Sequence, residues 1–461
     1  MSGGTIGSIV FGLVLTAVAF AHPIGPGLMI AAETPFDGIP FKLFGVAGNL
    51  ITFVPILILL MRLNPAYWGQ AFFGTRVQQF LALFIMALLP AHALLIVDQG
   101  LGQIFEFLRK GTLFLLVGVF VFSMRDGKYL ALLSKTLVAS MAVLTVLAML
   151  DFYLGIQLLP VKAGRLEGAA LGREFDPYMA TQWRFSGPGV PVNRYSNYLL
   201  LVIFLGVGWL MYVKSALQRF IALACVVVLV LGELFTITRS GILGMGVGMA
   251  LMLPLALRLR VQHVLGTIIV GGVVGVAAWY GASLTYADEV LVTRFGNVSD
   301  SLVGRFERIF AAVMIWADHP LLGTGWGTFS QYSPMYVTQG GKGAHNGYLN
   351  VLAETGVLGF IPLMLVTFAV VRRHLHRVGH LSKEFEFWRP YFLCGLVAQL
   401  ITNVFNDYLW ERYLWINFAF AVALEQCYQR QRAQRARDQL EELGSPGESE
   451  SDALSHRLGM P

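Results

Sequence analysis

Residues 340–360 read GGKGAHNGYLNVLAETGVLGF, a glycine-rich loop that ends at His345 and leads into a long apolar segment. The apolar segment predicts a membrane helix that begins at His345. Asn346, Asn350 and Glu354 recur every four residues, so they lie along one face of that helix. Because a polar stripe on a membrane helix faces protein or water rather than lipid, we expect the chemistry of the protein here.

The composition is that of an integral membrane protein. Hydrophobic residues make up 56% of the 461 residues and charged residues only 13%, whereas about a quarter of a soluble domain is charged. Cys225, Cys394 and Cys427 lie far apart, in or beside apolar segments, and we interpret them as packing residues. The sequence has no zinc-ligand spacing, nucleophile elbow or dinucleotide fingerprint. We therefore expect no metal, no cofactor and no nucleic-acid partner.

Apolar runs long enough to cross the roughly 30 Å hydrocarbon core of a bilayer follow one another with short breaks. They predict an all-α, polytopic membrane protein with about twelve transmembrane helices. The expected spans are residues 5–22, 43–61, 77–97, 111–124, 129–150, 195–213, 219–237, 240–257, 264–284, 347–371, 390–405 and 408–426. We expect one membrane-embedded domain over residues 1–426 and a disordered cytoplasmic tail over 427–461.

The placement of Lys and Arg predicts the orientation of these spans. With the N-terminus inside, almost every break that faces the cytoplasm is basic, and Arg109 and Lys110 are the one pair that does not comply. Two long segments then face outward, at about residues 159–193 and 285–345, together with the short turn at 238–241. The long segments are expected to contain short helices, one of them amphipathic over 303–317.

His345 is the candidate general base. The dipole of the helix that follows disfavours the imidazolium, and a neutral imidazole at the membrane surface can take a proton from a hydroxyl group. The alternative is an interfacial histidine that hydrogen-bonds to Asn346 or to water. From the residue type and its surroundings alone, the two interpretations are about equally favoured.

Several arginines are expected on the outer face, which the positive-inside rule leaves poor in cations. Arg239 lies between two apolar segments joined by almost no loop, where a guanidinium suits a phosphate or diphosphate group; the alternative is an ion pair with Glu233. The others make a cationic outer surface, namely Arg184, Arg194, Arg305 and Arg308. For Asp407, Glu411 and Arg412, at the outer end of the last helices, we expect a structural ion pair.

Four segments resemble the O-antigen ligase and polymerase superfamily. They are DHPLLGTGWGTF at residues 318–329, HNGYL at 345–349, LAETGVLG at 352–359 and the turn TRSG at 238–241. The resemblance covers roughly residues 184–425, in order and in topology.

The resemblance implies a polytopic enzyme of the bacterial inner membrane that acts at the periplasmic face. It would transfer a glycan from undecaprenyl diphosphate to an acceptor hydroxyl, such as that of lipid A-core, with no nucleotide sugar or metal. It implies His345 as the base and Arg239 as the diphosphate ligand, assisted by Arg305 and Arg184. Asn346, Glu354 and Asp407 would support them.

Two alternatives stay open. A repeat-unit polymerase of O-antigen or exopolysaccharide shares these segments, and a lipid-linked-glycan flippase belongs to a different class. A flippase predicts cationic residues along a path through the membrane, whereas here they cluster at the outer ends of the helices. The sugar, the acceptor, the linkage and the oligomeric state do not follow from the sequence.

Overall fold

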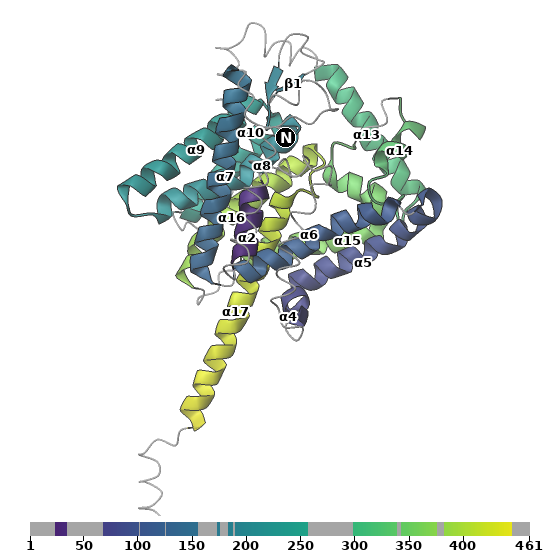
Figure 1. Cartoon of the computed structure of the whole chain (residues 1–461). Helices are drawn as coiled ribbons and strands as arrows, with labels where there is room; N and C mark the ends of the chain where they lie inside the picture. Colours follow the sequence, from purple (N-terminus) through teal and green to yellow (C-terminus); the bar gives the residue numbers. More distant parts are fainter. Residues whose placement is uncertain are drawn as a thin grey trace, which may run out of the picture.

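The protein is a bundle of long helices (Figure 1). The computed structural model describes residues 24–34, 68–100, 102–124, 126–154, 173–175, 183–187, 190–256, 298–338, 343–375 and 382–444. Its helices before residue 260 are α2 (Gly25–Glu33), α4 (Trp68–Phe73), α5 (Arg76–Gln99), α6 (Gly102–Ser123), α7 (Gly127–Leu154), α8 (Val192–Tyr212), α9 (Ala216–Thr236) and α10 (Arg239–Ala256). Those after it are α13 (Val298–Asp318), α14 (Phe329–Tyr332), the 3-10 turn η6 (Ser333–Met335), α15 (Gly347–Leu375), α16 (Lys383–Phe405) and α17 (Arg412–Gly444).

Five of the described helices are long and apolar enough to cross a membrane. These spans are Arg76–Ala93, Gly127–Phe152, Val192–Tyr212, Ala216–Thr236 and Gly347–Leu375, and shorter apolar helices cover Gly111–Ser123 and Arg239–Met252. The expected spans 5–22, 43–61 and 264–284 lie outside the described residues. A polytopic helical membrane protein therefore agrees with the structure, and the number twelve stays a prediction.

The described part of the first outer segment, expected to contain short helices, contains two short strands. β1 (Arg173–Phe175) pairs antiparallel with β2 (Trp183–Phe185), and Glu174 lies opposite Arg184 in the register. Strands in place of helices fit the alternation of large and charged residues in this stretch, since Trp and Phe flank an arginine in β2.

The basic breaks between helices come together at one end of the bundle, which we call the basic end. The last turn of α8 packs on the first turns of α16, with the Tyr212 ring 5.4 Å from that of Phe387. Near the end of α15, the Arg373 guanidinium lies 4.9 Å from the centre of the Tyr428 ring of α17. The turn before α7 joins them, because a Cβ at Gly127 would lie 2.5 Å from Cβ of Glu384.

Small residues bring α10 close to α16. A Cβ on Gly244 would lie 2.8 Å from the carbonyl oxygen of Ala398, and one on Gly248 would lie 3.1 Å from that of Cys394. Glycines four residues apart let two helix backbones approach closely inside a membrane. This contact fixes where α10 begins relative to the end of α16.

The amphipathic helix expected over 303–317 is confirmed as α13, but its large apolar side chains face outward. Phe306 and Phe310 are exposed, while Arg308 and Ala311 are buried against the protein. An outward apolar face suits the boundary between lipid headgroups and acyl chains. Figure 1 shows α13 and α14 at the side of the bundle, away from the projecting end of α17.

The tail differs from the expectation of disorder. α17 runs without interruption from Arg412 to Gly444, so residues 427–444 are helical. Their sequence is rich in Gln, Arg, Leu and Glu and has neither Gly nor Pro before Gly444. Such residues have high helix propensity, and a helix that starts inside the bundle continues through them without a new nucleation cost. The rest of the expected tail, residues 445–461, lies outside the described residues.

Candidate functional site

Helix α15 is broken at Gly356, and a loop from another part of the chain completes it. Gly356 has a φ of 59° and a ψ of −165°, so the helical hydrogen bonds stop there. The Gly325 N–H donates to the freed Glu354 carbonyl at 2.8 Å, and the Val357 N–H donates to the Pro320 carbonyl at 2.9 Å. Irregular backbone at membrane depth is tolerated where protein satisfies its polar groups in this way.

Glycine is required on both sides of this junction. A Cβ at Gly356 would lie 2.3 Å from the carbonyl carbon of Leu321, and one at Gly323 would lie 2.3 Å from the carbonyl carbon of Glu354. Both glycines also have positive φ, which favours glycine over other residues. The segments LLGTG and AETG are therefore the two halves of one structural unit.

Glu354 ties the same unit together through its side chain. Glu354 is 3% exposed, and its Oε1 accepts a hydrogen bond from the Phe329 N–H at 3.1 Å. Phe329 is the first residue of α14. The carboxylate thus fixes the turn that follows Gly325 against the first half of α15.

His345 lies two residues before α15, not at its first turn as the sequence suggested. It has a φ of 53°, and the helix begins at Gly347. Asn346 caps the helix, because its Oδ1 accepts a hydrogen bond from the Leu349 N–H at 3.0 Å. A capping Asn satisfies an N–H that the helix leaves open, which explains why the helix starts after the histidine.

Asn406 joins the turns that carry three of the predicted site residues. Its side-chain Nδ2 donates to Oγ of Ser240 at 2.7 Å, next to Arg239. Its carbonyl accepts the Gly347 N–H at 2.8 Å, two residues after His345. Since Asp407 follows Asn406 directly, the turns of Arg239, His345 and Asp407 meet at one place, which we call the Asn406 junction.

Arg239 is exposed at the first position of α10. The turn before it is held at Thr238, whose Oγ1 donates to Oδ1 of Asn193 at 3.4 Å. Ile237 has a φ of 49°, and it and His345 are the non-glycine residues with positive φ in the described part of the chain. Strained backbone of this kind costs about 1–3 kcal/mol per residue and is often found at functional sites.

Glu233, which the sequence offered as an alternative ion-pair partner for Arg239, makes other contacts. Glu233 is fully buried, and its Oε1 accepts a hydrogen bond from Oγ of Ser196 at 2.6 Å. A Cβ on Gly241 would lie 2.1 Å from the same Oε1, so the backbone of α10 passes close to this carboxylate. Glu233 therefore helps to hold the start of α10, while Arg239 extends to the surface.

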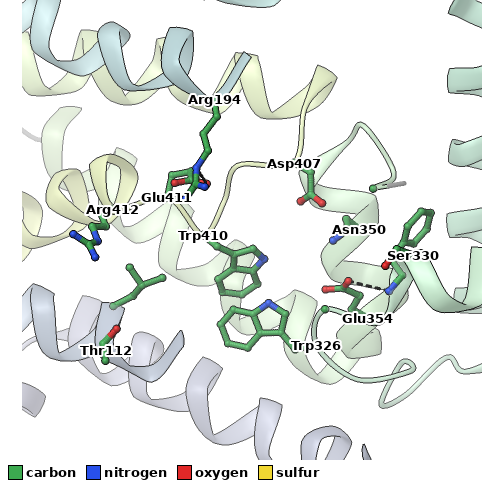
Figure 2. Close-up of a pocket in the computed structure, with 14 residues that line it drawn as sticks. Thr112, Arg194, Trp326, Ser330, Asn350, Glu354, Asp407, Trp410, Glu411 and Arg412 are labelled. Carbon is green, nitrogen blue, oxygen red and sulfur yellow. Dashed lines mark hydrogen bonds and ion pairs between the residues drawn. The ribbon is translucent and has the colours of Figure 1, made fainter. Parts of the chain in front are cut away.

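A cavity of about 420 Å³ lies beside the Asn406 junction (Figure 2). Its lining consists of Thr112, Leu113, Arg194, Trp326, Gly327, Phe329, Ser330, Gly343, Asn350, Glu354, Asp407, Trp410, Glu411 and Arg412. The loop before His345 reaches it at Gly343, where a Cβ would lie 3.1 Å from Oδ2 of Asp407. The cavity thus opens next to the chain segment that carries the histidine.

An ion pair and a pair of indoles form two walls of the cavity. Nε of Arg194 lies 2.6 Å from Oε1 of Glu411, and the Tyr198 hydroxyl donates to the other carboxylate oxygen. The rings of Trp326 and Trp410 have centroids 3.7 Å apart. Glu411 was expected to form a structural pair at the helix end, and its partner proves to be an arginine far away in the sequence.

The sequence-predicted residues fall into two groups. Glu354 and Asp407 line the cavity, while His345 and Arg239 belong to the adjoining turns at the Asn406 junction. Arg305 lies on α13 and is half-buried. Burial lowers the pKa of its guanidinium, so a nearby anion would stabilise the charged form of this side chain. Arg184 lies on β2, and the structure describes only its backbone position.

Other residues of the site were not assigned to it from the sequence. Asn406 had no predicted role, although an Asn directly before an Asp at a helix end was a visible signal. Trp326 and Trp410 had no predicted role in the site, and only the fold brings them into contact. Within the described residues, no group of three or more His, Cys, Asp or Glu side chains could hold a metal ion.

The comparison with known families covers part of this site. Residues 224–364 match the family model described as O-Antigen ligase. The match includes the Arg239 turn, α13, the loop that completes α15 and the α15 break itself. No curated protein matches the chain. The chain therefore carries, over residues 224–364, an O-antigen ligase domain, which is the domain of a family of membrane enzymes that transfer glycans.

Proposed function

We propose that the protein is a periplasm-facing glycan ligase of the bacterial inner membrane. It would move a glycan from undecaprenyl diphosphate to a hydroxyl group of an acceptor such as lipid A-core. The observation that carries the proposal is the Asn406 junction, because two hydrogen bonds of one residue bring the Arg239 turn and the His345 loop together. A diphosphate ligand and a general base are needed within one site for such a transfer.

In the proposed reaction the acceptor oxygen attacks the anomeric carbon of the donor sugar. The new glycosidic bond forms as the bond between that carbon and the phosphate oxygen breaks. His345 takes the proton from the acceptor hydroxyl, and undecaprenyl diphosphate leaves with the electron pair. The imidazolium then returns its proton to the solvent or to the departing diphosphate.

Arg239 is assigned to the diphosphate, with Arg305 and Arg184 assisting it. A cation at the first position of a helix is disfavoured by the helix dipole, and a bound anion reverses that cost. Arg239 is exposed at the helix start, so a lipid-linked ligand can reach it. Asn346 caps the helix that follows the base, Glu354 holds the Phe329 turn against that helix, and Asp407 borders the loop that carries the base.

The two ends of the bundle support the proposed membrane orientation. The basic end collects the cationic breaks, for example Arg373, and the positive-inside rule assigns it to the cytoplasm. Helices α8, α10, α15 and α17 begin at the other end, where the Asn406 junction lies. The site then faces the periplasm, where lipid-linked donors and acceptors meet without a nucleotide sugar.

Removing the base is the direct test. In nanodiscs, with an undecaprenyl-diphosphate-linked glycan as donor and lipid A-core as acceptor, His345→Ala is expected to lower kcat by about 10²–10⁴-fold. His319→Ala is the matched control, since His319 is exposed on the segment after α13 and is expected to keep the normal rate. Normal transfer by His345→Ala would show that His345 is not the base.

The same assay separates the ligase from its alternatives. Without lipid A-core, a repeat-unit polymerase would join two donor glycans, whereas the ligase would leave the donor unused. A flippase would move the donor across a vesicle bilayer and form no new glycosidic bond. Elongated lipid-linked glycan in the acceptor-free reaction would show that the protein is a polymerase and not a ligase.

A further inference from the structure

Two residues that line the cavity each have a buried polar atom with no partner among the residues that the structure describes. These atoms are the amide oxygen Oδ1 of Asn350 and the indole nitrogen Nε1 of Trp410. Asn350 is 4% exposed, and Figure 2 shows its amide and the two indoles around the same space. A buried polar atom without a partner is destabilising, and a ligand group that pairs with it removes that cost. A rotation of the terminal amide, a soft torsion, would bring the Asn350 oxygen to the cavity in exchange for the amide nitrogen.

These two atoms require different hydrogen-bond partners. The amide oxygen accepts, and the indole N–H only donates. Hydroxyl groups do both, so a ligand with several hydroxyls on one face satisfies both atoms at once. The hydroxyl groups of Thr112 and Ser330 line the same cavity and add two further sites of mixed character.

The charges of the lining argue against a phosphate. Three carboxylates, those of Glu354, Asp407 and Glu411, face two guanidiniums, those of Arg194 and Arg412. The Arg194 guanidinium is already paired with Glu411 at 2.6 Å. The lining thus has one more carboxylate than guanidiniums, which disfavours a diphosphate, whereas carboxylates accept well from neutral hydroxyls.

The indole wall of the cavity suits the apolar face of a sugar. Trp326 and Trp410 are in contact, with ring centroids 3.7 Å apart, and both line the cavity. The C–H groups of a pyranose are apolar and pack on aromatic surface, while the hydroxyls at its rim stay available for hydrogen bonds. A volume of about 420 Å³ lies within the range of small-molecule sites.

We propose that this cavity is a saccharide subsite, in which a sugar unit lies on Trp326 and Trp410 and hydrogen-bonds to Asn350 and the Trp410 N–H. The assignment rests on the proposed glycan transfer, and it adds the part of the substrate that the cavity holds. The sugar belongs either to the donor glycan or to the acceptor. Its place between the Gly343 loop and the Arg194 wall puts it beside the reacting groups without contact to Arg239.

Direct binding tests this without any transfer reaction. Full-length protein in nanodiscs is titrated with the methyl glycosides of glucose and N-acetylglucosamine and with methyl glucuronoside, and saturation-transfer NMR reports the bound sugar. Glycerol is the control polyol. At least one glycoside is expected to bind saturably, and Asn350→Ala and Trp410→Phe are each expected to weaken it about tenfold, the equivalent of one lost hydrogen bond.

The matched control is Trp388→Phe. Trp388 also has a buried Nε1 without a described partner, but it lies at the basic end beside Tyr212, so its loss is expected to leave sugar binding unchanged. Trp410→Phe keeps an aromatic ring, which protects the fold. Equal binding by wild type, Asn350→Ala and Trp410→Phe, or no glycoside signal above that of glycerol, would overturn the subsite.

Two further arms separate this proposal from the catalytic one and identify the source of the sugar. His345→Ala is expected to bind the glycoside normally while transfer is lost, so loss of transfer alone leaves the subsite intact. In transfer assays, Asn350→Ala is expected to raise KM for only one substrate, which places that substrate's sugar in the cavity. Unchanged KM for both substrates would also contradict the subsite.

Discussion

Aromatic rings pack at both ends of the helix bundle, but the two ends differ in the contacts that accompany them. At the basic end rings pack on rings, as Tyr212 does on Phe387, and Phe392 stacks on Phe420 with centroids 4.0 Å apart. At the opposite end helix starts and turns are joined by hydrogen bonds through Asn406, and Ile237 and His345 have strained backbones. Packing at the basic end stabilises the bundle, and this stability offsets the cost of the strained backbone around the polar site at the opposite end.

The largest expected effect on stability is at the basic end, where aromatic rings pack. Phe392 is buried and stacks on Phe420 at 4.0 Å, so Phe392→Ala should lower the free energy of unfolding by about 3–5 kcal/mol through the cavity it leaves. The donor KM of the folded fraction should stay the same. Phe368→Ala is the control, because Phe368 is 65% exposed. A large rise in donor KM for Phe392→Ala would show that the two ends are coupled.

The break in α15 should give the next largest effect. Gly356→Ala places a Cβ 2.3 Å from the backbone of Leu321 at a positive φ, which should cost about 2–3 kcal/mol and displace the loop that carries Trp326. Gly246→Ala is the matched control, since a Cβ there meets nothing within 4 Å. Thermal unfolding in nanodiscs measures both, and equal melting temperatures for the two variants would contradict the close approach.

The smallest of the three effects should come from the Asn406 junction. Asn406→Ala removes the 2.7 Å hydrogen bond to Ser240 and should cost about 1–2 kcal/mol, with a rise in donor KM because the Arg239 turn loses a tether. Ser240→Ala should show the same KM change. In a double-mutant cycle the two substitutions should couple by about 1 kcal/mol. Additive effects would mean that the bond does not hold the turn.

Much of the fold was accessible from the sequence because it depends on local patterns. Apolar length predicted the helices, and the placement of basic residues separated the two ends. The amphipathic period predicted α13, though not that Phe306 would face outward, since a period gives a face and not its partner. The end of α17 was misjudged because polar composition was taken for disorder, whereas Gln- and Glu-rich segments extend an existing helix well.

The site was less accessible because its contacts join distant segments. The positions of His345 and Arg239 stood out by residue type and topology, yet their connection through Asn406 depends on how α10 packs on α16. The partner of Glu411 is Arg194, which no sequence spacing could predict. The helix start at Gly347 was missed by two residues because Asn346 is a better cap than His345.

The completed break in α15 has a consequence for how related chains should be compared. The peptide groups of Gly325 and Val357 supply what the other segment lacks, so the two short motifs fold as halves of a single clasp. Gly323 and Gly356 each need glycine for a separate close approach, so a chain that keeps one of these glycines should keep both. A chain that has one motif without the other would have to close this clasp by a different route.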